Sequence, residues 1–398
     1  MKSTWKNGRV KDLIEYLESG VSVNGEDRTP SDTEPAVLKV SAVSYGVFDP
    51  RSSKPIIGPE LKRAKCNPKA GQIIISRSNT PDLVGASAYI FSDYPNRYLP
   101  DKLWQTVPKK DVASDLRWLA YYLASSWARF RLSRLATGTS DTMKNITQDE
   151  LLTLPVLIPP FPEQIAIADL LSTWDVTIEM TERLIAVKER LFEGLIQTLM
   201  GSPAVDWTHL QAQKIFKTIS EKRNGNEELL SVTQDRGVIP RSMLEGRVMS
   251  PESGTGGYKL IKKGDFAISL RSFQGGIEYS EYQGLISPAY TVLRPKLKIN
   301  NDYYRHFFKS YLFIEKYLSI AVIGIRDGKQ ISIPDFMTVK IPYPSVAEQK
   351  CIAATLNTAR QEIDLLKKQA EAYRRQKRGL MQKLLTGEWR MKTKEDAA

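Results

Sequence analysis

Residues 163 to 200 read EQIAIADLLSTWDVTIEMTERLIAVKERLFEGLIQTLM. Alternating steps of four and three residues from Ile167 to Leu199 meet an apolar side chain at every position except Thr181 and Lys188. Such a heptad pattern is typical of a coiled coil, in which the apolar seam of one helix packs against a second helix. The stretch therefore predicts one long helix that requires a partner helix.

The same pattern returns 185 positions further along the chain without an insertion or deletion, so that Glu163 corresponds to Glu348 and only Lys377 interrupts the second seam. Charge favours pairing of the two copies, because residues 163–200 carry a net charge of −4 and residues 348–398 a net charge of +5. The alternative is two ordinary amphipathic helices on separate domains. The residues predicted to pair the helices are Glu163, Gln164, Ile167, Leu171, Trp174, Ile178, Ile185, Leu195, Glu348, Gln349, Ile352, Leu356, Ile363, Leu366, Leu380 and Leu384.

The composition bounds the class of protein. With 398 residues, 41% of them hydrophobic and 26% charged, the chain is long enough for two or three domains with real cores. It has no run of 18 apolar residues and no signal-peptide core at its start, so we expect a cytoplasmic protein that does not bind membranes. Two cysteines and two histidines cannot build a disulfide framework or a zinc site, and we expect no metal.

A net charge of +12 suggests a polyanionic partner, with nucleic acid the first candidate and an anionic membrane surface the second. Residues 1–162 carry a net charge of +5 and residues 201–347 a net charge of +6, so both globular parts are basic. Both could therefore contact phosphates, although a merely soluble basic surface is the alternative.

Each long helix follows a globular stretch with the same succession of patterns. The first stretch predicts the amphipathic segment Val10–Leu17, a loop at Asn24–Pro35, strands at Val37–Val43 and Ile73–Ser76, a turn at Arg77–Asn79, a helical region at Leu116–Leu135 and a loop at Ala136–Asn145. The second predicts strands at Leu230–Thr233 and Gly264–Ser269, a helical region at Tyr303–Ile320 and a loop at Gly324–Gln330. We therefore expect an α/β (α+β) fold with two-fold pseudo-symmetry, made of two small units and two long helices.

Catalytic motifs are missing. A methyltransferase acting on an exocyclic amine needs Asn or Asp before Pro-Pro-aromatic, whereas Ile158 precedes Pro159, Pro160 and Phe161. The loop from Gly324 to Gln330 lacks the spacing and the Ser or Thr of a phosphate-binding loop. We expect no catalytic residue, and interpret the chain as a binding subunit.

This duplicated arrangement, with Pro-rich entries to Glu-Gln and helices ending in Gly194-Leu195 and Gly379-Leu380, resembles the specificity (S) subunit of Type I restriction-modification systems over essentially the full length. The resemblance implies two target recognition domains that each read one half of a split DNA site, and two antiparallel helices that set the spacer. The domains it implies are residues 1–154, a central helical region at 155–201, residues 202–340, a second helical region at 341–390 and a tail at 391–398.

The resemblance also implies the partners. These are double-stranded DNA, two modification (methyltransferase) subunits that use S-adenosylmethionine to methylate adenine, and two restriction subunits that use ATP and Mg to cleave. No cofactor is expected in this chain. The alternatives are a noncatalytic structural adaptor that binds DNA without sequence preference and, more weakly, an isolated methyltransferase, against which the missing motifs argue.

The candidate DNA-reading residues lie in loops that follow corresponding strands. Arg can bridge the O6 and N7 atoms of guanine, and Asn or Gln the N6 and N7 atoms of adenine. For each position the alternative is a solvated side chain or a contact to phosphate alone. The candidates are Arg77, Ser78, Asn79, Ser140 and Lys144 in the first unit and Arg271, Ser272, Gln274, Arg326, Lys329 and Gln330 in the second.

Overall fold

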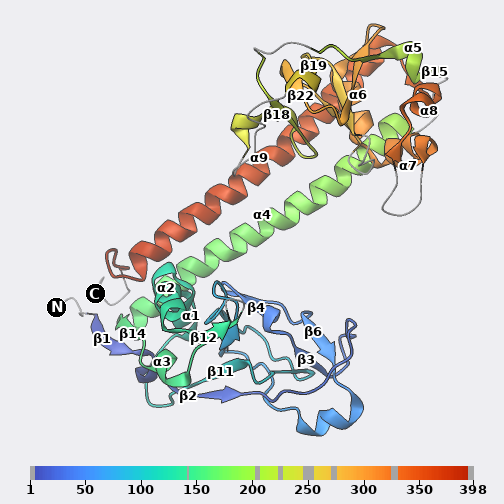
Figure 1. Ribbon diagram of the computed structural model, residues 1–398. Coiled ribbons are helices and arrows are strands. Elements are labelled where there is room, and N and C mark those ends of the chain that lie inside the picture. The colour runs from blue at the N-terminus through green and yellow to red at the C-terminus, as the bar shows by residue number, and fades with distance from the viewer. Residues whose placement is uncertain are drawn as a thin grey trace. The chain divides into compact units, whose positions relative to one another are not determined.

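The computed structural model in Figure 1 describes residues 5–140, 143–201, 207–222, 227–244, 255–269, 276–323 and 330–392. The chain forms two compact units, one of residues 1–180 and 370–398 and the other of residues 181–369. Two long helices, α4 (Phe161–Gly201) and α9 (Val346–Leu384), each contribute residues to both units.

The first unit is built on an antiparallel sheet with the strand order β2-β11-β7-β9. Two further small sheets and a hairpin flank it, and β1 pairs with β14, so that the two ends of the globular part lie together. The strands are β1 (Lys6–Arg9), β2 (Ile14–Ser19), β3 (Ala36–Leu38), β4 (Val43–Ser44), β5 (Val47–Phe48), β6 (Ser53–Pro55), β7 (Ile73–Ser76), β8 (Ser78–Asn79), β9 (Ser87–Tyr89), β10 (Arg97–Tyr98), β11 (Leu103–Pro108), β12 (Thr137–Ser140), β13 (Met143–Asn145) and β14 (Pro155–Ile158). The helices are α1 (Leu116–Ala124), α2 (Ser126–Leu135) and α3 (Gln148–Leu152).

The core of the first unit lies between this sheet, α1 and the ends of the long helices. Trp118 and Leu119 of α1 are buried together with Ile167 and Leu171 of α4 and with Leu384 of α9. Burial of such apolar surface is the main favourable term in folding, so the long helices are part of the core of this unit.

The second unit repeats the plan with the sheet order β16-β23-β20-β21 and with β15 paired to β26. The strands are β15 (Thr208–Gln211), β16 (Phe216–Ile219), β17 (Leu230–Thr233), β18 (Gly237–Pro240), β19 (Lys259–Ile261), β20 (Phe266–Ser269), β21 (Ile277–Tyr279), β22 (Gly284–Ile286), β23 (Tyr290–Pro295), β24 (Val322–Ile323), β25 (Gln330–Ile331) and β26 (Lys340–Tyr343). The helices are α5 (Ala212–Ile215), α6 (Asn301–Lys309), α7 (Tyr311–Lys316) and α8 (Ile333–Thr338).

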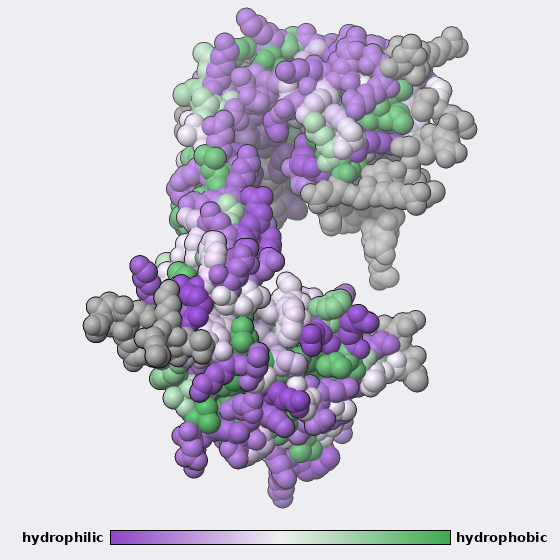
Figure 2. Space-filling model, turned by 90° about the vertical axis from the view of Figure 1, so that its left-hand side faces the viewer, coloured by the Kyte–Doolittle hydropathy of each residue, from purple (hydrophilic) through white to green (hydrophobic). Residues whose placement is uncertain are grey.

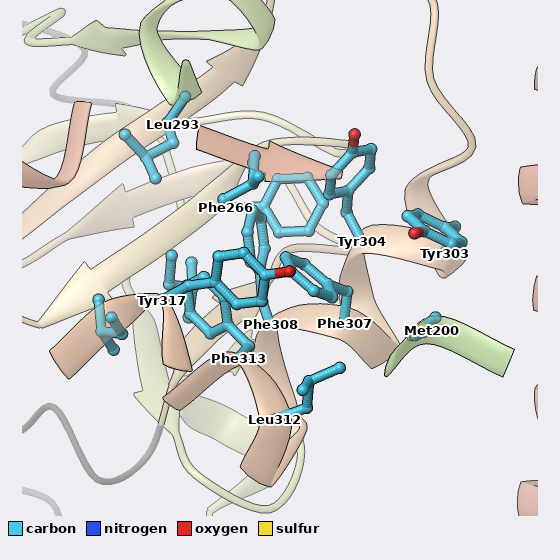
Figure 3. Close-up of a cluster of buried hydrophobic side chains, with 14 of the residues drawn as sticks. Met200, Phe266, Leu293, Tyr303, Tyr304, Phe307, Phe308, Leu312, Phe313 and Tyr317 are labelled. Atoms are coloured by element: carbon cyan, nitrogen blue, oxygen red, sulfur yellow. The ribbon is translucent and has the colours of Figure 1, made fainter. Parts of the chain in front are cut away.

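An aromatic cluster fills the core of the second unit (Figure 3). Phe266 and Phe308 meet edge to face with ring centroids 5.3 Å apart, and Phe308 also lies 4.9 Å from Phe313. Edge-to-face and tilted pairs match the positive edge of one ring to the negative face of another, which adds to the gain from burial.

The predicted duplication is confirmed in the elements. Adding 185 to the bounds of α1 gives the bounds of α6, and adding it to β14 gives β26. The helical regions predicted at 116–135 and 303–320 are each broken at one serine. Ser125 and Ser310 are in extended backbone, and their hydroxyls cap α2 and α7 by accepting from Ala128 N and Phe313 N.

Four predictions in the first unit need correction. The loop predicted at Ala136–Asn145 contains two paired strands, β12 and β13. The amphipathic segment Val10–Leu17 divides into a 3₁₀ turn at Val10–Asp12 and strand β2, because β2 pairs along β11. The strand predicted at Val37–Val43 is interrupted by a 3₁₀ turn at Val40–Ala42. Ser78 and Asn79 form strand β8 rather than a turn.

The two long helices run antiparallel within each unit. In the first unit, Trp174 of α4 packs edge to face on Tyr373 of α9 with ring centroids 5.7 Å apart. In the second, Lys188 forms an ion pair of 2.6 Å with Glu362, and Arg360 lies 4.3 Å from the Phe192 ring centroid. The contacts confirm the seam predicted from the heptads.

The two lysines in the seam have partners on the other helix. Lys188 pairs with Glu362 in the second unit, and Lys377 pairs with Asp175 in the first. A charged residue in a coiled-coil seam costs stability in every register except the one that pairs it. These two lysines therefore favour the observed alignment over slipped ones.

Candidate nucleic-acid interface

A small three-stranded sheet brings the candidate residues of the first unit together. Strand β13 pairs with β8 on one side, with Lys144 opposite Asn79, and with β12 on the other, with Met143 opposite Ser140. We call this sheet of β12, β13 and β8 the reading sheet. The two loops predicted to read DNA are therefore one structure, because β8 and β13 pair across more than sixty residues of sequence.

The backbone of Arg77 is fixed on both sides. Its N–H donates to Lys102 O at 3.0 Å, and its carbonyl accepts from Ile146 N at 2.9 Å. Its guanidinium lies 5.9 Å from the centroid of the Trp104 ring, at the limit of a cation–π contact. The half-buried side chain thus leaves the sheet from a held position.

The two residues that follow differ in access. Ser78 is only 3% exposed, so its hydroxyl does not face solvent. Asn79 is half-buried, its Nδ2 donates to Ser76 Oγ at 3.2 Å, and its Oδ1 accepts from Thr80 N at 2.9 Å. These bonds fix the amide plane while leaving one N–H and one lone pair, which is the set that an adenine edge requires.

Lys144 is held in the same sheet. Its Nζ donates to Gly138 O at 2.9 Å, which leaves two of the three ammonium donors for a ligand. Gly138 has φ +150°, and a Cβ there would lie 2.8 Å from Met143 O, so glycine is required for the hairpin to close. Ser140 belongs to β12, but its side chain lies outside the described part of the chain.

Arg129 of α2, which no sequence motif distinguishes, anchors the loop that follows β8. It is 9% exposed, its guanidinium donates to Val84 O at 2.6 Å and to Asp82 O, and it lies 5.5 Å from the Tyr45 ring centroid. Burial lowers the pKa of this guanidinium, and no carboxylate pairs with it among the described residues. A buried cation held by carbonyls is costly, which points to a positioning role for the loop beside the reading sheet.

In the second unit the hairpin of β24 and β25 stands where β12 and β13 stand in the first. Adding 185 to Thr137 and Asn145 gives Val322, the first residue of β24, and Gln330, the first residue of β25. Gln330 pairs with Ile323 in this hairpin, but its side chain lies outside the described residues. The candidates Arg271, Ser272, Gln274, Arg326 and Lys329 also lie outside them.

One glutamine in each unit ties the N-terminus of α1 or α6 to a long helix. Gln164 accepts from Asp115 N at 2.9 Å and donates to Pro159 O at 2.9 Å, while Gln349 accepts from Asn300 N at 2.8 Å and donates to Pro344 O at 2.9 Å. Each residue of the second set lies 185 positions after its counterpart in the first. Both glutamines were predicted to pair the helices, whereas their observed bonds link each helix to the unit before it.

Glu163 gathers both ends of the first unit. It accepts from Trp5 Nε1 at 2.9 Å, from Arg390 at 2.7 Å and from Met391 N at 3.0 Å. Burial acts to raise the pKa of this carboxyl, but the three donors outweigh it and leave the pKa below its ordinary value. The carboxylate is therefore a structural anchor.

The outward side of α4 carries an unpaired apolar stripe. Leu184, Val187 and Leu191 are exposed in the second unit, and Val176 and Met180 in the first, at helical spacing. Hydrophilic residues dominate the face of the molecule shown in Figure 2, with smaller hydrophobic patches among them. These side chains form a candidate surface for another protein, because exposed apolar patches on a polar surface often bind partners.

The family follows from the duplicated geometry. A family model for the Type I restriction modification DNA specificity domain matches residues 2–189 and 209–372. The chain belongs to this family. Each match of the specificity domain covers one globular part of the chain and a large part of the long helix that follows it.

Two specificity subunits align with most of this chain. It is 23% identical to the MjaX type I restriction enzyme specificity subunit of Methanocaldococcus jannaschii, over 98% of this chain and 94% of the relative. It is 26% identical to the MjaVIII specificity subunit of the same organism, over 71% of this chain and 72% of the relative.

Solved structures share its fold. The S subunit of the Type I restriction-modification system from M. genitalium aligns with a TM-score of 0.58 and 18% identity over 96% of both chains. A structure described in terms of complex assembly and conformational transition of the type I restriction-modification system aligns with a TM-score of 0.60 and 14% identity over 97% of this chain and 98% of that one.

Two further kinds of site are not found in the described residues. Among them, no group of three or more His, Cys, Asp or Glu side chains could hold a metal ion. Within the same residues, no helix has the length and apolar content to cross a membrane.

Proposed function

We propose that this chain is the DNA-specificity subunit of a Type I restriction-modification complex, in which each unit reads one half of a bipartite, asymmetric DNA site. The observation that carries this proposal is the repetition of one specificity-domain fold with different side chains at equivalent places. A binding scaffold duplicated in one chain and then varied suits two unlike half-sites.

The reading sheet supports direct contact with bases in the first unit. Asn79 and Lys144 extend from the reading sheet, and Arg77 from the residue just before β8; all three have fixed positions, and none is fully exposed. Fixed donors discriminate between bases because they cannot rearrange to suit a wrong one, and a good bidentate pair contributes about 1–3 kcal/mol of discrimination.

The stripe on α4 supports the recruitment of modification subunits. A partner helix would cover Leu184, Val187 and Leu191, and each buried side chain of this size contributes about 1.5–3 kcal/mol. In this proposal the chain is noncatalytic by itself. The modification subunits supply the S-adenosylmethionine chemistry, and restriction subunits supply ATP-dependent cleavage.

The test compares DNA binding and methylation with and without partners. We expect the complex with modification subunits to methylate adenine at a bipartite site and to prefer that site over random duplex by about 10³-fold or more. Methyl transfer by the isolated chain would contradict the noncatalytic role. Equal affinity of the complex for all duplexes would instead show an adaptor without sequence preference.

A further inference from the structure

Helix α2 has a buried face and an exposed face, and none of the candidate reading residues lies on it. Its inner face, with Ala128, Arg129 and Leu132, is buried. Its outer face consists of Trp127, Phe130, Arg131 and Arg134, all of them exposed. The spacing of three, four and seven residues from Trp127 places these four side chains on one side of the helix.

The outer face of α2 is organised as two aromatic–guanidinium pairs. The guanidinium of Arg131 lies 4.4 Å from the Trp127 ring centroid, and that of Arg134 lies 5.7 Å from the Phe130 ring centroid. Trp127 is 41% exposed and Phe130 is 60% exposed, although both are large apolar groups. Stacking holds a guanidinium by its flat side, so its N–H edge stays available for a ligand.

The charge of the outer face is not balanced locally. Residues 126–135 include three arginines and no acidic residue. Within the described part of the chain, neither Arg131 nor Arg134 has a carboxylate partner, whereas Arg117 of α1 is paired with both Asp115 and Asp169. Two unneutralised guanidiniums side by side fit the paired oxygens of phosphates.

The position of α2 connects this face to the reading sheet. Helix α2 ends at Leu135 and strand β12 begins at Thr137, so a single residue separates them. On the inner face, Arg129 holds Asp82 and Val84 of the loop that follows β8. The outer face is thus rigidly joined to both edges of the reading sheet.

We propose that the outer face of α2 binds backbone phosphates of the DNA beside the half-site read by the first unit. This inference rests on the proposed function and adds a second set of contacts to it. Phosphate contacts set the orientation of a protein on the duplex without carrying sequence information, and the reading sheet would then meet the bases in a fixed register.

A protein partner fits this face less well. The residues 185 positions later are Leu312, Glu315, Lys316 and Ser319, which include neither a second pair of aromatic rings nor an arginine. Leu312 is also buried. A partner that docks in the same way on both halves would need the surface on both, whereas flanking DNA contacts can differ between halves.

The test is the salt dependence of DNA binding by the full chain in complex with modification subunits, measured with one duplex of about forty base pairs. Each phosphate contact contributes about 0.9 to the slope of log affinity against log salt concentration. The double variant Arg131→Gln/Arg134→Gln should lower the slope by about 1.8. Between 50 and 200 mM salt, its affinity should then fall roughly tenfold less than that of the wild type.

Two variants serve as controls. Arg131→Lys/Arg134→Lys keeps both charges and should retain most of the slope. Lys109→Gln/Lys110→Gln also removes two charges, but just after the C-terminal end of β11 at Pro108. The opposite end of β11, at Leu103, is the one that pairs with Ser76 beside the reading sheet. This control should leave the slope unchanged.

The outcomes separate the two proposals. An unchanged salt slope in Arg131→Gln/Arg134→Gln would overturn the phosphate contact. If that variant also assembled poorly with modification subunits, the outer face of α2 would be a protein-binding surface instead. If the slope falls but the wild type shows no sequence preference, the phosphate contact stands and the specificity function fails.

Discussion

The two units share their plan and the bonds that join them to the long helices, but they differ in core side chains and in the residues of the candidate reading loops. Gln164 and Gln349 make the same two hydrogen bonds at a spacing of 185 residues. In contrast, Leu123 of α1 is replaced by Phe308 in α6, within a core rich in aromatic rings. The scaffold is therefore repeated where a unit meets the helices, while the interior and the reading surfaces are free to differ.

The largest expected effect tests whether the two cores are independent. Phe308→Ala should lower the free energy of unfolding of the second unit by about 3–5 kcal/mol, since it removes a fully buried ring. Hydrogen exchange should show lost protection in α6 and unchanged protection in α1. The matched variant Leu123→Ala should cost about 2–5 kcal/mol and show the reverse. Equal losses in both helices for either variant would mean that the units unfold as one.

The shared glutamines should behave alike. Gln164→Leu and Gln349→Leu each remove two hydrogen bonds and leave buried backbone groups without a partner, at a cost of about 2–3 kcal/mol. Hydrogen exchange should accelerate at Asp115 in the first variant and at Asn300 in the second. Gln197→Leu, on the exposed side of α4, should change neither amide. A clear difference between the two variants would argue against an equivalent scaffold.

Arg129 should act in one half only. Arg129→Met frees the loop at Asp82 and Val84, and we expect discrimination at the first half-site to weaken by about 1–3 kcal/mol while the second half-site is read as before. Methylation of substrates mutated in either half would measure this. The matched variant Ile314→Met, 185 residues later, should affect neither half. Equal loss in both halves would reduce Arg129 to a general stabilising residue.

The smallest expected effect is a pH dependence confined to the second unit. His306 Nε2 donates to Asn357 Oδ1 at 2.7 Å, in the place that Tyr121 occupies in the first unit. Burial lowers the pKa of His306, nearby Arg305 and Arg360 lower it further, and Asn357 and Asp302 oppose them. The unfolded chain thus binds the proton more readily. Stability from His306 is present above about pH 6.5 and is lost as the pH falls below it.

The measurement requires a variant, because Glu278 opposes this effect. Burial raises the pKa of Glu278 to about 7, so its folded form gains stability as the pH falls through that value. Between pH 7.5 and 5.5, we expect the second unit of His306→Gln to lose less stability against denaturation than that of the wild type. Identical pH profiles would show that His306 is not linked to stability.

The sequence predicted the repeated parts and not the irregular ones. The heptads of residues 163–200 and their copy predicted both long helices, because an apolar seam repeated over more than four heptads indicates a long helix that packs against a second helix. The strand β8 was missed, since two residues become a strand only by pairing with β13, which lies far away in sequence. Arg129 was missed because a buried arginine in a helix looks like a solvated one until its carbonyl partners are known.

The central claim is that each unit reads its own half of the DNA site. The most direct measurement replaces residues 1–150 with the corresponding unit of another family member and maps the methylated adenines produced by the assembled complex. We predict that one half of the recognised sequence changes and that the other half stays the same. A change in both halves, or in neither, would contradict it.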